Sequence, residues 1–258
     1  MKANKELGQH FLTDQSVIEK ITEQSFNKDC SHLLEVGPGQ GALTKNLSQK
    51  DLPLFLVEKD TRFKEILESF IIKENIIFQD ALEINWASFC HQHHLEKVWL
   101  ISNLPYNIGT LLTLNFIQAE QILHMTLMMQ KEVGLRFLPI KSNHMNSLAV
   151  LAQTYFDVER LCLVPPGAFN PPPKVDSIVL NFSRKKSPEI PLALWSIFQI
   201  FLKNLFQQRR KQIRKVLCLT YSKSDVENYL NQESISFEIR AESLKLEQVQ
   251  KLFYLFHT

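Results

Sequence analysis

Short apolar segments alternate with helical segments between residues 33 and 129, and this alternation constrains the fold more than any other feature of the sequence. Strands are predicted over 33–36, 54–57, 76–78, 98–101 and 125–129, because each segment is short and apolar. A first helix is expected to begin near Thr13 or Asp14, since either side chain can cap it. Buried strands that alternate with helices are typical of a parallel sheet covered on both faces. The sequence therefore predicts an α/β fold.

The pattern changes after this region. Residues 177–182 alternate between apolar and polar, which predicts a last, half-exposed strand. Residues 183–191 are polar and charged and contain two prolines, so we interpret them as a linker. Helical periodicity continues from there to the end. We predict a larger α/β domain over 1–183 and a small helical domain over 184–258.

Several classes of protein are disfavoured by the composition. No apolar run approaches the roughly 20 residues that span a bilayer, and the four cysteines are widely spaced. Neither a disulfide framework nor a cysteine zinc site is favoured, and a cytoplasmic protein without a metal is expected. The metal-capable run Cys90-His91-Gln92-His93-His94 is predicted to be a solvated helix end or loop, because zinc sites usually combine ligands from two separated places.

The charge is unevenly distributed. The net charge is only +2, yet the segment from Arg184 to Val216 holds nine Lys or Arg against one acidic residue, Glu189. This segment therefore carries +8 and the remainder −6. Such a basic block is typical of a phosphate-binding surface, although solvated helix faces also collect Lys and Arg.

Polar or glycine residues stand at the end of each of the first four predicted strands. Steps of 21, 22 and 23 residues separate Gly37, Glu58, Asp80 and Asn103. In open α/β sheets ligands bind outside the carboxyl ends of the strands. Glu58 is suited to accept from two ribose hydroxyls, and Asp80 from an exocyclic amine such as that of adenine. The glycine loop that begins at Gly37 also fits the pattern G-x-G-x-x-A, so by itself it does not separate a nicotinamide cofactor from S-adenosylmethionine.

The Asn-Leu-Pro-Tyr turn (103–106) favours methyl transfer. Pro105 has no N–H and pushes Leu104 toward extended geometry, so the carbonyls of the turn need not be used locally. The Asn103 side-chain oxygen and the Leu104 carbonyl could accept both N–H groups of an aromatic amine and meet the positive charge that develops on its nitrogen. Tyr106 could stack on the base. Taken alone, the same residues would be interpreted as a turn that closes a strand.

Motifs along the chain resemble those of the ribosomal RNA small-subunit adenine dimethyltransferase family. They occur in order, with fitting spacing, at 7–12, 35–44, 79–81, 103–108, 130–133, 165–177 and 208–211. The resemblance implies a Rossmann-like class I methyltransferase that uses S-adenosylmethionine to dimethylate N6 of two adjacent adenosines near the 3′ end of 16S RNA in an immature 30S subunit. A monomer is expected.

The resemblance assigns roles to particular residues. The cofactor site would be lined by His10, Leu12, Gly37, Glu58, Asp80 and Asn103. The target amine and base would meet Asn103, Leu104 and Tyr106, with Phe169 as a second aromatic wall. The basic block, rather than the resemblance, predicts RNA contacts by Arg209, Arg210, Lys211, Arg214 and Lys215.

Some positions depart from the family pattern. Gly109 stands where the family usually has Ser, Met145-Asn146 where Tyr-Gly is common, and Leu7 where Phe is frequent. Relatives that methylate large-subunit RNA and confer antibiotic resistance share the core motifs. A non-catalytic RNA-binding assembly factor and a nicotinamide-dependent oxidoreductase are further alternatives, against which the intact Asn-Leu-Pro-Tyr turn argues.

Overall fold

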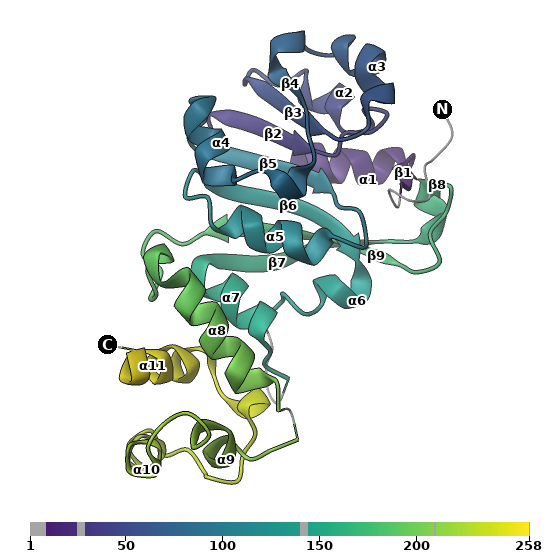
Figure 1. Ribbon diagram of the computed structural model, residues 1–258. Coiled ribbons are helices and arrows are strands. Elements are labelled where there is room, and N and C mark those ends of the chain that lie inside the picture. Colours follow the sequence, from purple (N-terminus) through teal and green to yellow (C-terminus); the bar gives the residue numbers. More distant parts are fainter. Residues whose placement is uncertain (1–8, 25–28, 140–143, 209, 258) are drawn as a thin grey trace. The chain divides into compact units, whose positions relative to one another are not determined.

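The computed structural model describes residues 9–24, 29–139, 144–208 and 210–257. The chain folds into two compact units, unit 1 with Met1–Leu135 and Asp157–Arg184 and unit 2 with Arg136–Phe156 and Lys185–Thr258 (Figure 1). The second boundary between the units follows Arg184, one residue beyond the predicted domain boundary after residue 183. Residues 136–156, however, belong to unit 2 rather than to the larger α/β domain where we expected them.

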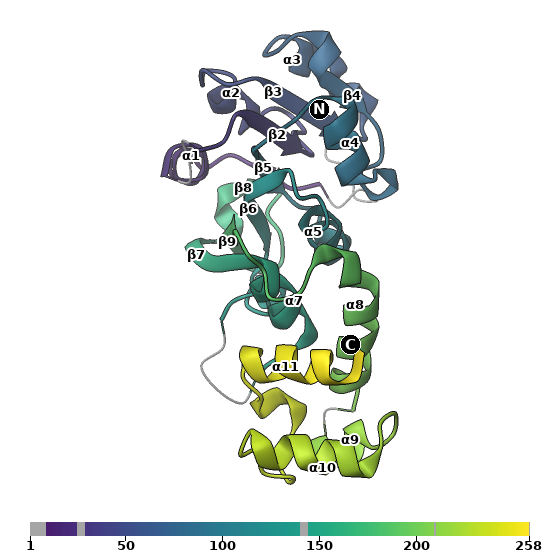
Figure 2. The same cartoon turned by 90° about the vertical axis from the view of Figure 1, so that its left-hand side faces the viewer.

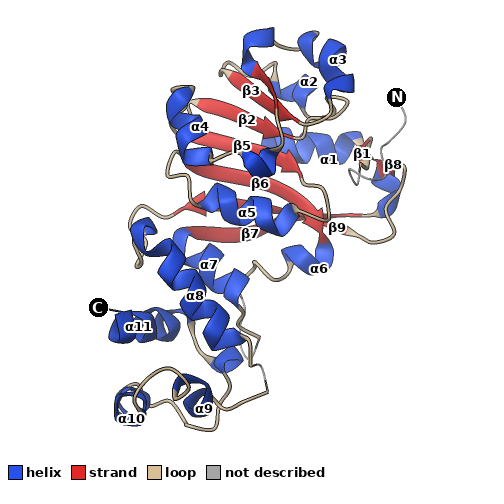
Figure 3. Cartoon of the chain, in the orientation of Figure 1, coloured by secondary structure: helices blue, strands red, loops and turns tan. Residues whose placement is uncertain are grey.

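Unit 1 is built on a seven-stranded sheet with the order β4-β3-β2-β5-β6-β9-β7 (Figures 1 and 3). Neighbouring strands from β4 to β6 are parallel, and β9 pairs antiparallel with β6. The predicted α/β class is confirmed. The strands are β2 (His32–Val36), β3 (Leu54–Glu58), β4 (Ile76–Phe78), β5 (Val98–Asn103), β6 (Ile122–Gln130), β7 (Phe156–Val164) and β9 (Ser177–Arg184).

Helices cover both faces of this sheet. The helices α1 (Gln15–Glu19) and α2 (Thr44–Leu47) lie on one face, and α4 (Trp86–Gln92) and α5 (Gly109–Ile117) lie on the other (Figures 1 and 2). The central strands are therefore buried from both sides, which explains their continuous apolar sequence. Asp14, one of the two predicted caps, begins α1 by accepting from the Ser16 N–H at 2.9 Å. Unit 1 also contains the short helices α3 (Lys64–Glu68) and α6 (Lys131–Gly134).

Strand β9 corrects one prediction. It was expected to be half-exposed, but Ile178, Val179, Leu180 and Phe182 are all buried. The reason is that both faces of β9 are covered. Val179 belongs to the core cluster that also holds Leu12 and Phe169, and α6 packs on the other face, where Gly134 lies close to Ile178 and Leu180. A separate two-stranded ribbon pairs β1 (Phe11–Leu12) antiparallel with β8 (Phe169–Asn170). It joins the start of the described chain to the proline loop, residues 165–177.

Unit 2 is helical, as the pattern after the linker predicted. Its helices are α7 (Ser147–Tyr155), α8 (Trp195–Phe206), α9 (Ile213–Leu217), α10 (Lys223–Gln232) and α11 (Leu246–His257). Phe198 on α8 meets Phe253 on α11 edge-on at 4.9 Å between ring centroids, and these rings centre the apolar core. Among the described helices of both units, none is long and apolar enough to cross a membrane.

The departure at Met145-Asn146 has a structural role in this unit. Asn146 is the N-cap of α7, and its side chain accepts from the backbone N–H groups of Leu148 and Ala149 at 3.0 and 3.1 Å. Met145 is buried. The departure at Leu7 lies outside the described residues.

Candidate active site

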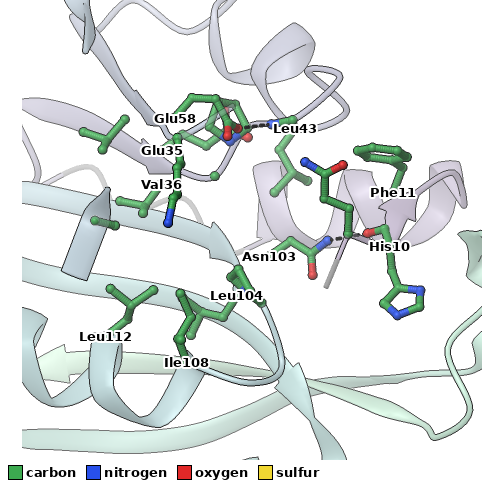
Figure 4. Close-up of a pocket in the computed structure, with 18 of the residues that line it drawn as sticks. His10, Phe11, Glu35, Val36, Leu43, Glu58, Asn103, Leu104, Ile108 and Leu112 are labelled. Carbon is green, nitrogen blue, oxygen red and sulfur yellow. Dashed lines mark hydrogen bonds between the residues drawn. The ribbon is translucent and has the colours of Figure 1, made fainter. Parts of the chain in front are cut away.

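The carboxyl ends of β2, β3, β4 and β5 meet at one edge of the sheet and border a cavity of about 220 Å³ (Figure 4). Parallel pairing brings them there, because parallel strands end at the same edge. The segment 9–12 and the Asn-Leu-Pro-Tyr turn complete the lining. The predicted residues gathered here are His10, Leu12, Gly37, Glu58, Asp80, Asn103, Leu104 and Tyr106.

The glycine loop (37–41) leaves β2 in a backbone conformation that favours glycine. Gly37 has a φ of +72°, and a β-carbon placed there would have no heavy atom within 4 Å. The backbone at Gly37 can therefore approach a ligand closely. The helix that follows the loop, α2, begins only at Thr44 and has four residues, so its dipole contributes little.

Glu58, at the end of β3, is fixed by backbone donors. One carboxylate oxygen accepts from the Gly39 N–H at 2.9 Å and the other from the Asp60 N–H at 2.8 Å. The residue is only 6% exposed, and burial raises the pKa of its carboxyl group. Each carboxylate oxygen can accept a further hydrogen bond. Glu58 thus ties the glycine loop to β3 and retains capacity for a ligand.

Asp80, after β4, carries a partner that the sequence did not reveal. Its Oδ2 lies 2.7 Å from the Lys59 Nζ, and its Oδ1 accepts from the Leu82 N–H at 3.0 Å. The hydrogen bond from Lys59 is the main reason that the pKa of Asp80 is lowered. Lys59 itself lines the cavity. Any amine bound by Asp80 shares the carboxylate with this lysine.

Glu35 is a second residue that sequence reasoning missed. It lies within β2, lines the cavity and is only 2% exposed. Its Oε2 accepts from the Thr44 hydroxyl at 2.7 Å. Burial raises the pKa of its carboxyl group to about 8, and the charge of Glu58 acts in the same direction. The available signal was its place two residues before Gly37, since an acid inside a buried strand requires a reason.

The Asn-Leu-Pro-Tyr turn presents acceptors, as predicted, with one correction. The Asn103 Nδ2 donates to the His10 carbonyl at 3.0 Å, so the amide nitrogen faces that backbone and the oxygen lies on the other side (Figure 4). No described residue donates to the Leu104 carbonyl. The Pro105 carbonyl, in contrast, accepts from the Ile108 N–H at 3.2 Å. The expectation of free carbonyls therefore holds for Leu104 and was wrong for Pro105.

The Gly109 departure lies directly behind this turn. A β-carbon at Gly109 would lie 3.4 Å from the Leu104 β-carbon, an ordinary contact. The β-carbon of the family's serine would therefore fit here without moving the turn.

Two aromatic residues were expected to face each other, and the structure places only one of them at the cavity. The Tyr106 hydroxyl is 2.6 Å from the Ser177 Oγ, and its ring stacks on His10 at 5.4 Å between centroids. Phe169 is 4% exposed in a core cluster with Leu12 and does not belong to the described lining. The reason is its pairing with Leu12 in the β1–β8 ribbon, which turns the ring into the core.

Some basic side chains of the block are exposed, and others are bonded to neighbouring groups of the protein. Arg210 and Lys211 are exposed and line an open groove of unit 2 together with Arg240 and Glu242. Lys215 is also exposed. Arg214 was expected to contact RNA, but its Nε donates to Glu227 at 2.7 Å.

Other members of the block are unavailable or lie outside the structure. The Arg184 guanidinium donates to the carbonyls of Ile117, Ala119 and Ile122. Arg209 lies outside the described residues. The +8 of the segment therefore overstates the charge available to an RNA.

The cysteine and histidine run falls at the end of α4. Cys90 is buried, and burial raises the pKa of its thiol to about 12. The His93 ring packs on Phe89 at 4.5 Å between centroids. Within the described part of the chain, no group of three or more His, Cys, Asp or Glu residues could hold a metal ion.

The sequence matches the ribosomal RNA adenine dimethylase family over residues 1–258. Ribosomal RNA small subunit methyltransferase A of Neorickettsia sennetsu is 38% identical over 258 residues, covering 96% of this chain and 96% of that protein. The protein of the same name from Flavobacterium johnsoniae is 37% identical over 253 residues, covering 96% and 93%.

Solved structures share the fold. A dimethyladenosine transferase from Plasmodium falciparum superposes with a TM-score of 0.75 at 21% identity, covering 94% of this chain and 96% of that one. The 23S rRNA methyltransferase ErmE superposes with a TM-score of 0.73 at 23% identity, covering 96% and 100%. The family match over the whole length and the relatives at 37% and 38% identity place the chain in the ribosomal RNA adenine dimethylase family, whose members are methyltransferases that use a donor of the S-adenosylmethionine type.

Proposed function

We propose that this chain transfers methyl groups from S-adenosylmethionine to N6 of two adjacent adenosines near the 3′ end of small-subunit ribosomal RNA, giving N6,N6-dimethyladenosines during ribosome assembly. Relatives named ribosomal RNA small subunit methyltransferase A, at 35–38% identity, support this substrate. The observation that carries the chemistry is the Asn103 amide, whose nitrogen is held by the His10 carbonyl at 3.0 Å. Its oxygen is thereby available as an acceptor beside the Leu104 carbonyl.

The cavity lining fits such a donor. Its described acidic residues are Glu35, Glu58 and Asp80, and the donor carries positive charge on its sulfur and on its amino group. Glu58 would hold the ribose hydroxyls and Asp80 the adenine amine, while Gly37 lets the backbone come close. When bound, the donor supplies a methyl group attached to a positively charged sulfur.

The turn would then position the acceptor amine. The Asn103 oxygen and the Leu104 carbonyl would accept its two N–H groups, so that the nitrogen lone pair points at the methyl carbon. As the nitrogen–carbon bond forms, the carbon–sulfur bond breaks and its electron pair stays on sulfur. The positive charge that arrives on nitrogen is stabilised by the same two oxygens. The proton leaves to water afterwards, so no general base is required before transfer. Tyr106 would stack on the base.

Unit 2 would supply much of the RNA affinity. It contains fourteen Lys and Arg against seven Asp and Glu, so its formal charge is +7 while unit 1 carries −5. We infer that Arg210, Lys211 and Arg240, which share one groove, contact RNA phosphates. Lys215, which is exposed, and Arg209 remain predicted RNA contacts. Phosphate contacts of this kind position an RNA without reading its sequence.

The test is transfer of labelled methyl groups to immature small subunits, followed by mapping of the modified bases. Two dimethylated adenosines near the 3′ end of the small-subunit RNA are expected, with no label on large-subunit RNA. Label on large-subunit RNA would instead favour the resistance-type activity. Binding of RNA without any transfer would indicate a non-catalytic assembly factor.

A further inference from the structure

We propose that His10 is a positioning residue for methyl transfer, which fixes both the Asn103 amide and the Tyr106 ring in the orientation that receives the adenine. This inference rests on the proposed function and assigns to His10 a role beyond lining the donor cavity. His10 touches Asn103 through its carbonyl, Tyr106 through its ring and Pro171 through its Nδ1. It therefore connects the Asn-Leu-Pro-Tyr turn to the proline loop.

The carbonyl of His10 determines which way the Asn103 amide faces. A backbone carbonyl can only accept, so the side-chain atom 3.0 Å from it must be the NH₂ nitrogen. The opposite orientation would place two oxygens in contact. The His10 backbone is itself held in place, because the next residues pair with β8 and the Thr13 N–H donates to the Ala168 carbonyl at 2.8 Å. The Asn103 oxygen is consequently presented as an acceptor before any substrate arrives.

The ring of His10 determines where the Tyr106 ring lies. The two rings are stacked with an interplanar angle of 27°. The Nδ1 is 2.8 Å from the Pro171 carbonyl, and this partner requires the proton on Nδ1. The Tyr106 hydroxyl is held separately by Ser177, which is buried. The tyrosine is thus fixed at its tip and on one face, and an adenine must stack on the opposite face.

These contacts form a closed circuit. It runs from His10 to Tyr106, from Tyr106 to Ser177, back along the proline loop to Pro171, and from Pro171 to His10. Removal of the His10 ring would abolish the stack on Tyr106 and the hydrogen bond to the Pro171 carbonyl, while Ser177 would still hold the Tyr106 hydroxyl. The expected consequence is a tyrosine that is anchored but free to tilt, and a base that is bound but poorly aligned.

The first experiment separates turnover from binding. Because His10→Ala removes the ring stack on Tyr106 and one hydrogen bond, it should lower the single-turnover rate on small-subunit RNA by roughly 10-fold. The affinity for RNA should stay within about twofold. The affinity for S-adenosylmethionine should fall by less than the rate, since His10 also lines that cavity. His10→Phe, which keeps the stack, should recover part of the rate. His91→Ala, at an exposed histidine of α4, is the matched control. A normal rate for His10→Ala, or an equal loss of donor affinity, would overturn the proposal.

The second experiment tests whether His10 acts through Tyr106. In a Tyr106→Ala background, His10→Ala should lower the rate by less than about twofold, because the ring that it supports is gone. If His10→Ala lowered the rate by the same factor with and without the Tyr106 ring, His10 would not act through Tyr106.

Ring-labelled tyrosine in magnetic resonance gives a readout that does not depend on activity. The Tyr106 signal, assigned by its loss in Tyr106→Phe, should move in His10→Ala and not in His91→Ala. An unmoved signal contradicts the inference about His10, whereas a wild-type chain that transfers no methyl group contradicts the proposed function.

Discussion

At the scale of single residues, Glu35 links proton binding to donor binding. Burial raises the pKa of its carboxyl group from the ordinary value of 4.5 to about 8, so the unliganded site holds a proton at neutral pH. A donor with positive charge favours the ionised carboxylate and must displace that proton. The affinity for S-adenosylmethionine should therefore rise between pH 6 and 8, by at most about tenfold per pH unit for one proton released. Calorimetry in two buffers of different ionisation enthalpy would measure the proton, and Glu35→Gln should abolish its release.

The Glu35 carboxyl group should affect folding stability in the opposite direction: donor affinity rises with pH, whereas the free energy of unfolding falls. Because the folded-state pKa is raised, Glu35 favours the folded state fully below pH 4.5, and this contribution is lost as the pH rises toward about 8. The free energy of unfolding of the unliganded protein should decline over that range, and less so in Glu35→Gln. If donor affinity fell with rising pH, Glu35 would not be the group that releases a proton when the donor binds, and the predicted direction of the pH dependence would be wrong.

Asn103 carries the chemical step in the proposed mechanism. Asn103→Ala should reduce turnover by roughly 10² or more, by analogy with the loss of one preorganised hydrogen-bonding group at a developing charge. Both methylations should suffer, because the monomethylated amine still presents one N–H. RNA affinity should hardly change, since phosphate contacts supply most of it. Single-turnover assays with mapping of mono- and dimethylated bases would measure this. If Asn103→Ala dimethylated RNA at the normal rate, residues 103–106 would have only a structural role as a turn.

At the scale of elements, the buried parallel strands were the predictable part of the fold. They are covered on both faces, so almost every residue is apolar and a short run suffices to identify them. Strand β7 was missed because exposed residues such as Asp157, Glu159 and Arg160 interrupt it. The burial of β9 depends on α6 packing against Ile178 and Leu180, which no local pattern reveals.

The candidate site was predictable to the same extent. Residues at strand ends, such as Glu58, Asp80 and Asn103, follow from topology alone. Lys59 and Glu35 were missed because their importance comes from contacts across the sheet edge, with Asp80 and Thr44. Phe169 was misplaced because its pairing with Leu12 joins segments far apart in the sequence.

The cap of α7 gives a prediction at this scale. Replacing an N-cap Asn by Ala costs about 1 kcal/mol, whereas Gly costs only a few tenths. Asn146→Ala should therefore destabilise unit 2 by about 1 kcal/mol, and Asn146→Gly, which restores the residue common in the family, should have a much smaller effect. Urea unfolding followed by the circular dichroism of helices would compare them. Equal losses for both variants would show that the two hydrogen bonds to Leu148 and Ala149 do not stabilise the helix.

At the scale of the whole molecule, charge is divided unevenly between the two units. Unit 1 carries −5 and unit 2 carries +7. The acidic residues that line the cavity suit a cationic donor, and the basic surface of unit 2 suits a polyanion. Donor affinity and RNA affinity should therefore respond to different substitutions.

Replacement of Arg210, Lys211 and Arg240 by Gln tests this division. Each lost phosphate contact should lower the slope of log affinity against log salt concentration by about 0.9 on duplex nucleic acid, so the slope should fall by up to about 3. Donor affinity should be unchanged. Arg214→Gln is the matched control from the same segment, because its guanidinium is bound to Glu227; it should lower the stability of unit 2 and leave the slope nearly intact. Filter binding of small-subunit RNA from 50 to 200 mM salt would measure both variants. If Arg214→Gln lowered the slope as much per charge as the triple variant, RNA affinity would follow the total charge of unit 2 rather than this groove.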